Sequence, residues 1–555
     1  MHMAEPMMTM EELKRLRGDR QAKICYLPVT EEISSKYLKE AKVRVDQILG
    51  AESVSPDRIA GRCFYIANGG DDTADGLSED TPWKTTGRLQ SAQADGTVQP
   101  GDGVFFRRGD VWDSVYATPT GGNCAMRMMS GVTYSAYGKG EKPLFRNCLN
   151  AVGGQNWEKT VYSNVWVYTG DAGDRRNDIG NIVVNNGEYY AIKATPADPN
   201  HPYDPCKLTV DCGMVTNKKE VFHSGGIPFT APGCLVHNLE FFHNYEERKL
   251  YLYWDGGNPG ECFWELLLVR RGNVVRSDED SHDILIDNLA VKYGGSHGIN
   301  LTECHNIRIQ NCLFGWIGGS LQECDDNNTI QYGNAVENWG GCNGFTITDC
   351  VVFECYDAGL TTQAARKDPD WPVLMTEVDF SDNVIAYTNF AIELWCTNPA
   401  ENPGPPYLNQ MKNTRVNNNY CLYSGYHFGH QRSVKNGTFG NLAGKSPYQV
   451  FLNCQMRGNK FLYTSSFAQY SRSLLMGDSQ KGFDLSNNIY IVGADKAYVR
   501  SCTEPENGQG EGRLYPYDEE ALTTLASLGL EKDSIFYYYE GNLYPEEARG
   551  VYLYL

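Results

Sequence analysis

The chain has 555 residues, a formal net charge of −20 and a sequence pI near 5.0. This acidic balance argues against nucleic acid, which binds to basic surfaces. It also weighs against a polyanionic polysaccharide, unless a local basic patch overrides the net charge. The sequence has no run of about 18 apolar residues, so it predicts no membrane-spanning helix.

The first 60 residues carry the helical pattern of the chain. Apolar residues recur at spacings of three and four within 31–49, as on one face of an amphipathic helix. The open end of a solenoid needs cover, so we expect residues 1–60 to form a helical cap. The remaining residues, 61–555, are expected to form one β-helix domain.

The N-terminal residues and the cysteines bear on the cellular compartment. No apolar signal segment is present near the N-terminus, so the sequence predicts a cytoplasmic protein, or a secreted one if a natural signal was trimmed. The 18 cysteines are scattered and none forms a C-x-x-C pair, which favours reduced thiols.

Residues 63–112 hold a recognisable opening. They begin CFYIANGGDDTADGLSEDTPWKTTGRLQSA and end GDGVFFRRGDVW. This segment resembles the first coil of right-handed parallel β-helix proteins of the pectin-lyase-like group. The resemblance implies a strand, a loop rich in glycine and aspartate, a turn, a short helix and a strand pair.

Residues 150–275 are less regular than the rest. The phrases NDIGNIVVNNG and RKLYLYWDGGNP alternate as strands do, and they resemble a segment that precedes the regular coils in predicted β-helix glycosidases. We expect a β-rich insertion packed on the β-helix.

Regular coils are predicted over residues 276–500, with a C-terminal cap over 501–555. Short alternating strands, each closed by Asn or Asp, align as ILIDN, IRIQN, FTITD, VDFSD, TRVNN and FDLSN, the last ending at Asn487. Asn tolerates the left-handed backbone that a stacked turn requires. Cys312 and Cys350, directly after two of these turns, are expected to stack in the core. A β-sandwich is the alternative, but it rarely repeats one signature in register.

A second strand in four of these coils predicts the functional face. Aligning the aliphatic residues Ile299, Val336, Leu360 and Ile392 inward leaves the next residue of each strand outward: Asn300, Glu337, Thr361 and Glu393. Glu337 and Glu393 are then two coils apart, or roughly 10 Å.

Three carboxylates on one face suit glycoside hydrolysis. One carboxyl protonates the leaving oxygen, and a second attacks the anomeric carbon or activates water. We expect Asp357 to be the nucleophile or general base and Glu393 or Glu337 to be the general acid. Retention and inversion both stay open. Each glutamate has a structural alternative as a solvated side chain, and Asp357 has one as a turn former.

A resemblance sharpens the site. YGGSHGI, NCLFGWIGGS, YGNAVENWGG and CYDAGLTTQ, between Tyr293 and Gln363, resemble phrases of predicted β-helix glycosidases. Gln331 and Asn338 depart from that pattern. The resemblance and the aromatic residues together indicate a substrate-binding set: His297, Asn300, Tyr332, Asn334, Trp339, Gln363 and Trp395. Tyr356 is expected to flank the same face.

Two other functions remain open. A polysaccharide lyase would use Arg366, Lys367 or Lys292 as base, with Ca²⁺ held by an acidic cluster: Asp278, Glu279, Asp280 and Asp283, or Asp325 and Asp326. A carbohydrate-binding β-helix without catalysis would explain the aromatics but not the clustered carboxylates. No zinc motif and no nucleotide-binding loop occurs.

The sequence therefore predicts a glycoside hydrolase that acts on oligosaccharides or polysaccharide ends, without a cofactor. Insertions at 322–331, 364–375 and 397–411 are expected to wall the site into a pocket, which favours exo-action. The carbohydrate is the expected partner. The sugar, the linkage and any homo-oligomer are left open.

Overall fold

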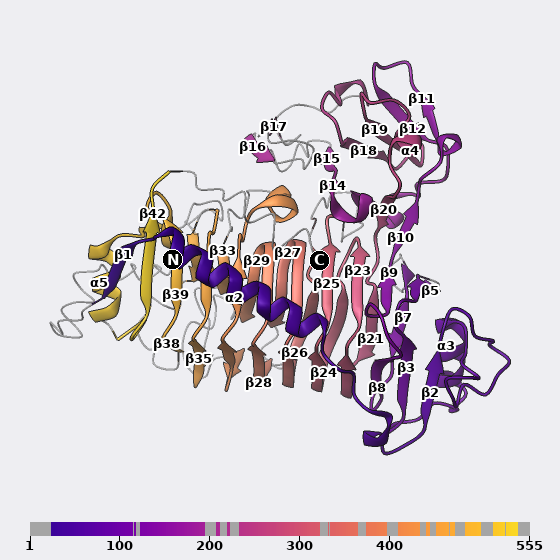
Figure 1. The fold of residues 1–555 in the computed structure, drawn as a ribbon, viewed down its shortest axis with the longest axis horizontal. Coiled ribbons are helices and arrows are strands. Elements are labelled where there is room, and N and C mark those ends of the chain that lie inside the picture. The colour runs from indigo at the N-terminus through magenta and orange to yellow at the C-terminus, as the bar shows by residue number, and fades with distance from the viewer. Residues whose placement is uncertain are drawn as a thin grey trace, which may run out of the picture.

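The protein is a right-handed parallel β-helix with a β-rich insertion above its coils and a long helix along its side (Figure 1). The computed structural model describes residues 24–114, 116–117, 123–194, 207–210, 219–222, 232–321, 331, 333–364, 373–396, 409–432, 440–444, 451–465, 467–471, 483–500, 514–527 and 529–541.

Each coil contributes to three parallel sheets. The first sheet holds β2 (Cys63–Ile66), β3 (Gly103–Arg107), β8 (Thr133–Tyr137), β22 (His282–Asp287), the second halves of β24 (Ile299–Gln310) and β26 (Val336–Thr348), β28 (Leu374–Ser381), β31 (Arg415–Asn417), β35 (Cys454–Arg457) and β38 (Phe483–Ser486). The second holds β4 (Val111–Asp113), β9 (Leu144–Arg146), β23 (Ala290–Gly294), β25 (Leu313–Ile317), the first halves of β27 (Val351–Ala364) and β29 (Val384–Cys396), β32 (Tyr420–Leu422), β36 (Lys460–Leu462), β39 (Ile489–Gly493) and β42 (Ile535–Tyr539).

The third sheet carries the face of interest. It holds β7 (Met126–Met128), β21 (Val275–Glu279), the first halves of β24 and β26, the second halves of β27 and β29, β33 (Gly440–Gly444), β37 (Phe467–Ser471) and β40 (Ala497–Arg500). Inward residues of all three sheets form one continuous core, because each coil buries its apolar side chains against the next.

The predicted Asn/Asp turns are confirmed. All six closing residues are left-handed, with φ between 53° and 62°: Asn288, Asn311, Asp349, Asp382, Asn418 and Asn487. The amide ladder between coils lies one residue later, where the backbone N–H of Asn383 donates to Asn419 Oδ1 at 3.0 Å. Cys312 and Cys350 fill that position in earlier coils, fully buried as expected.

One coil escaped the sequence pattern. Strand β35 stacks between β31 and β38, so FDLSN belongs one coil later than its alignment suggested. Its turn uses Gly458, with φ of 68°, in place of Asn or Asp. Glycine adopts this backbone without a side-chain partner, and the signature is therefore absent.

The N-terminal helix is confirmed, and it covers a side of the solenoid. Helix α2 (Glu31–Leu49) packs its buried face, which includes Ala41 and Val45, against residues of the second sheet. Strand β1 (Cys25–Pro28) pairs in parallel with β42, so a strand rather than the helix covers that end. At the opposite end α3 (Thr86–Ala94), the short helix that the resemblance implied, packs into the core (Figure 1).

The expected β-rich insertion lies between β9 and β21. One sheet joins β10 (Cys148–Asn150), β20 (Leu266–Arg270), β13 (Ile179–Val184) and β14 (Tyr189–Tyr190). The other joins β11 (Trp157–Lys159), β12 (Val165–Tyr168), β19 (Lys249–Tyr253), β18 (Glu240–Asn244) and β15 (Ile192–Ala194). The two sheets share an apolar core of their own. Among the described residues, no helix is both long and apolar enough to cross a membrane.

Candidate active site

The third sheet brings the predicted outward residues into one row. Asn300 pairs with Glu337, Glu337 with Thr361, and Thr361 with Glu393 in the strand register. The sequence alignment of these strands is therefore confirmed. Two parallel-strand steps separate Glu337 from Glu393, which is about 10 Å along the backbone.

Glu337 is buried and held from one side. Its Oε2 lies 2.8 Å from His297 Nδ1 and accepts a bond of 2.6 Å from Asn334 Nδ2. Burial by itself would raise the pKa of Glu337, but His297, the Asn334 bond and the charge of Arg432 outweigh it and hold the pKa below its usual value. Glu337 is therefore ionised near neutral pH, and no described residue donates to its Oε1.

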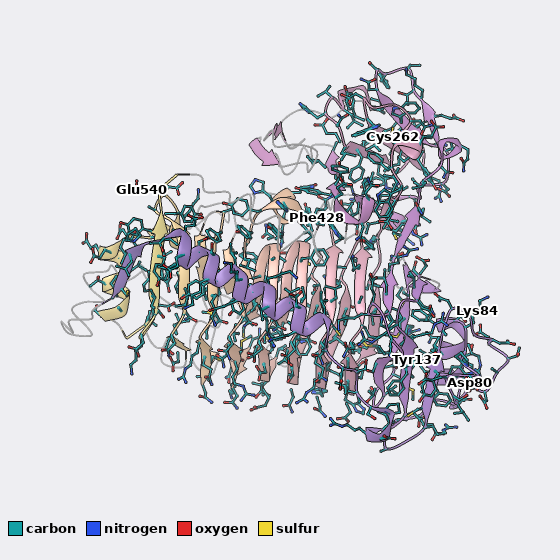
Figure 2. The ribbon with its side chains drawn as sticks, viewed as in Figure 1. Asp80, Lys84, Tyr137, Cys262, Phe428 and Glu540 are labelled. Carbon is teal, nitrogen blue, oxygen red and sulfur yellow. The ribbon has the colours of Figure 1, made fainter. Side chains whose placement is uncertain are left out.

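Asp357 forms a buried ion pair that the sequence reasoning missed. Arg432 Nη1 contacts Asp357 Oδ1, and both side chains are at least nine-tenths buried. Arg432 follows η6 (His427–Gln431), a short helix that returns across β27 and β29. Figure 2 shows Phe428 of this helix above those strands. This segment has no strand periodicity. The sequence therefore carried no signal for the ion pair beyond an isolated arginine in a connection.

The insertion holds the η6 segment in place. Gln431 Nε2 donates to Ala191 O at 3.0 Å, and Tyr356 OH donates to Gln431 O at 3.2 Å. Tyr356 is buried against Phe428, at 5.6 Å between ring centroids. The expectation that Tyr356 flanks the substrate is therefore wrong, because η6 covers its ring.

Glu393 and the tryptophans form the far part of the row. Gln363 Nε2 donates to Glu393 Oε2 at 3.5 Å. Trp339 and Trp395 meet edge to face at 5.9 Å between ring centroids, and Trp339 is 38% exposed. An exposed aromatic ring two coils from its partner can carry the apolar face of a sugar.

The remaining predicted residues divide between the row and the undescribed part of the chain. Asn300 lies in the row, half-buried. Tyr332, Arg366, Lys367, Asp325 and Asp326 lie outside the described residues, as do most of the insertions expected to wall a pocket: 322–330, 365–372 and 397–408.

Of the other candidates for lyase chemistry, Lys292 lies on a different sheet, and the acidic cluster begins at the end of β21. Lys292 is on the second sheet, opposite Gly315, and burial lowers its pKa to about 8. In the acidic cluster, Asp280 pairs with His305 at 3.0 Å and Asp283 with His282 at 2.9 Å. Within the described ranges, no three potential metal ligands converge.

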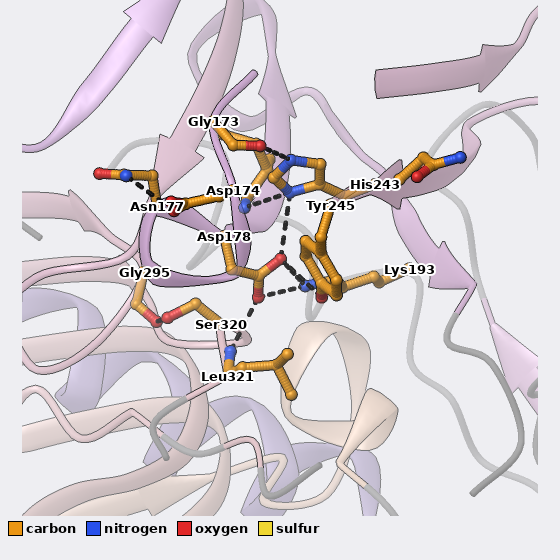
Figure 3. A network of polar contacts seen from close by, with 12 residues as sticks. Gly173, Asp174, Asn177, Asp178, Lys193, His243, Tyr245, Gly295, Ser320 and Leu321 are labelled. Atoms are coloured by element: carbon orange, nitrogen blue, oxygen red, sulfur yellow. Dashed lines mark hydrogen bonds and ion pairs between the residues drawn. The ribbon is translucent and has the colours of Figure 1, made fainter. Parts of the chain in front are cut away.

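A further buried carboxylate, Asp178, joins the insertion to the solenoid (Figure 3). Asp178 is fully buried and contacts Lys193 Nζ with both oxygens. It also accepts from Tyr245 OH at 3.0 Å and from the backbone N–H of Leu321 at 2.8 Å, and His243 Nδ1 lies 3.2 Å away. Burial disfavours the charged forms of both Asp178 and Lys193. The charge of Lys193 and the donors around Asp178 nevertheless lower the pKa of Asp178 to about 2.

Comparison with curated proteins found a partial match. No protein-family model matches the chain. The lacto-N-biosidase of Bifidobacterium longum subsp. longum is 30% identical over 166 residues, which is 27% of this chain and 9% of that protein. The chain thus matches less than a tenth of this curated relative.

Several solved structures are similar at low identity. A structure titled glycoside hydrolase is 11% identical, with a TM-score of 0.44, over 88% of this chain and 98% of that one. A complex of XylC with xylose is 11% identical, with a TM-score of 0.43, over 85% and 82%. The GH136 lacto-N-biosidase from Eubacterium ramulus is 14% identical, with a TM-score of 0.30, over 92% and 70%. The fold assignment rests on the strand pairing of the chain itself.

Proposed function

We propose that this protein is a glycoside hydrolase that cleaves oligosaccharides or polysaccharide ends. One observation carries the proposal: Glu337, Asp357 and Glu393 come from three successive coils, Glu337 and Glu393 lie in one outward row, and Arg432, the ion-pair partner of Asp357, also acts on Glu337 by its charge. Paired carboxylates are the equipment of most glycosidases. The partial likeness to a lacto-N-biosidase supports the same reaction class.

The contacts of each carboxylate suggest its role. Asp357 is the nucleophile or general base, since the ion pair with Arg432 favours its ionised form. Glu393 is the general acid that protonates the leaving glycosidic oxygen. Glu337 is the weaker candidate for the acid because its pKa is lowered. It would instead stabilise the positive charge that develops on the sugar ring. These steps use no metal or cofactor.

Product analysis tests the reaction. The parent, Asp357→Asn and Glu393→Gln would be incubated with a panel of plant and host glycans, and the products read by mass spectrometry. Glu377→Gln is the matched control, because Glu377 is exposed on the first sheet and contacts only Asn413 among the described residues. We expect saturated products from the parent and the control, and a loss of roughly 10²- to 10⁴-fold in the two variants.

Other outcomes would contradict the proposal in distinct ways. Products lighter by one water, with ultraviolet absorbance from a new double bond, would mean a lyase. Equal activity in all variants would move the site elsewhere. The anomer released first, read by NMR, separates a close retaining pair from a wide inverting pair. A ladder of mid-sized products from a long polymer would contradict action at chain ends.

A further inference from the structure

Two arginines continue the outward row of the third sheet beyond Asn300. Arg276 on β21 pairs in register with Asn300 on one side and with Arg127 on the other. The row therefore begins with the two arginine cations, continues with the amide of Asn300 and ends at the carboxylates of the proposed active site. Arg276 lies two coils from Glu337 and four from Glu393, or about 10 Å and about 19 Å at the backbone.

The two arginines differ in their partners. Arg127 forms an ion pair with Asp278, which is itself largely exposed. Arg276 is half-buried, its Nε makes no hydrogen bond, and no described carboxylate forms an ion pair with it. A guanidinium normally meets a carboxylate, sulfate or phosphate through its paired donors. Arg276 thus adds a positive charge to this face that the described residues do not neutralise.

We propose that Arg276, supported by Arg127, binds an anionic group on a sugar at the far end of the substrate. The proposal rests on the glycosidase function above, and it narrows the substrate class to acidic oligosaccharides. One carboxylate or sulfate would sit at Arg276, while a less charged part of the chain reaches the carboxylates. The ionised Glu337 would repel a second anion, so the acidic sugar lies away from the cleaved bond.

This inference agrees with the net charge of −20. An acidic protein disfavours a ligand with many anionic groups, because repulsion grows with each additional charge. A ligand with one anionic sugar meets the local charge of Arg276, with which no described carboxylate forms an ion pair. The local charge thus selects a singly acidic oligosaccharide over a polyanionic polymer.

A binding assay that needs no hydrolysis tests the inference. The parent, Arg276→Ala and Arg276→Lys would be measured on immobilised glycans in matched pairs, with and without one carboxylate or one sulfate. Arg308→Ala is the control, because Arg308 is exposed on the first-sheet half of β24, the strand that carries Asn300. Thermal melts would confirm that all variants fold.

We expect the parent and the control to prefer the acidic members. Arg276→Ala should weaken acidic binding roughly 10- to 100-fold and leave neutral binding unchanged, while Arg276→Lys keeps part of the preference. The preference should shrink at high salt. Carboxylate and sulfate pairs show which anion is bound.

Three results would overturn the inference: binding to neutral members only, an acidic preference unchanged in Arg276→Ala, or no binding to any acidic member. Hydrolysis of neutral glycans, with no preference for acidic ones, would contradict the anion subsite and leave the proposed glycosidase function intact. Acidic binding lost in Arg276→Ala, with no cleavage of any glycan, would uphold this subsite and contradict the glycosidase.

Discussion

Asp178 in the insertion and Glu337 on the coils are buried carboxylates with histidine and cation neighbours. Asp178 contacts a lysine, a tyrosine hydroxyl and a backbone N–H, and both of its oxygens are engaged. Glu337 has a histidine and an amide on a single oxygen, Oε2. Both carboxyls have a lowered pKa, yet only Glu337 keeps an oxygen to which no described residue donates.

The number of engaged carboxylate oxygens distinguishes a buried acid with a structural role from one with a functional role. A carboxylate whose acceptor positions are filled by protein donors joins parts of the chain, and here Asp178 joins β13 to Leu321 after β25 (Figure 3). A carboxylate bonded from one side only can still meet a ligand. A lowered pKa alone does not distinguish them, since paired structural groups are shifted as strongly as catalytic ones.

Removing Asp178 should give the largest change in stability. Asp178→Ala leaves Lys193 buried without its counter-ion, so we expect a loss of about 3–5 kcal/mol in unfolding free energy. Denaturant unfolding measures it. Asp171→Ala removes an exposed partner of Arg248 in the same insertion and should cost at most about 1 kcal/mol. Equal losses in the two variants would contradict the structural role of Asp178.

Glu337→Gln should show the reverse behaviour. The amide keeps an acceptor for Asn334 but loses the charge, so kcat/KM should fall about 10²- to 10³-fold with little change in melting temperature. Kinetics and a thermal melt on the same preparation measure both. If stability falls and activity persists, Glu337 belongs with Asp178 as a structural acid.

The pH dependence of stability separates the two regions further. The folded pKa of Asp178, about 2, lies below the unfolded value near 4. At a pH above 4 the ionised carboxylate therefore contributes about 2 kcal/mol to the free energy of unfolding. This contribution is lost as the pH falls towards 2. Unfolding of the parent and Asp178→Asn between pH 7 and 3 measures it. A constant difference between the two proteins over this range would show that the ionised carboxylate does not stabilise the fold.

Trp339→Ala should have the smallest effect. Trp339 is 38% exposed and its ring meets Trp395 edge to face, so loss of the ring should raise KM about fivefold, equivalent to roughly 1 kcal/mol, and leave folding intact. Steady-state kinetics on the best substrate measures it. A large drop in melting temperature would mean that the ring packs for stability instead of carrying a sugar.

Much of the site could be predicted because a β-helix repeats its geometry. Period-two alternation and a constant step between coils were enough to align Asn300, Glu337 and Glu393 on one face. The turns were legible for the same reason, since a left-handed backbone selects Asn or Asp. The coil at β35 was missed because Gly458 takes the left-handed backbone at its turn, where the other coils have Asn or Asp.

The partners of these residues could not be predicted. Arg432 reaches Asp357 from a connection 75 positions later in the chain, and Gln431 beside it is held by Ala191 of the insertion. Neither contact follows from a repeat. The burial of Tyr356 depends on the same returning segment.

The sequence by itself determined the solenoid, its Asn/Asp turns and the row of outward residues, because these depend on local alternation and on turn chemistry that each coil repeats. Only the tertiary structure decided which carboxylates are bonded, by what and from which side. Those contacts join segments far apart in the chain, through loops and an insertion that follow no period, and they arise when the insertion and η6 pack onto the coils.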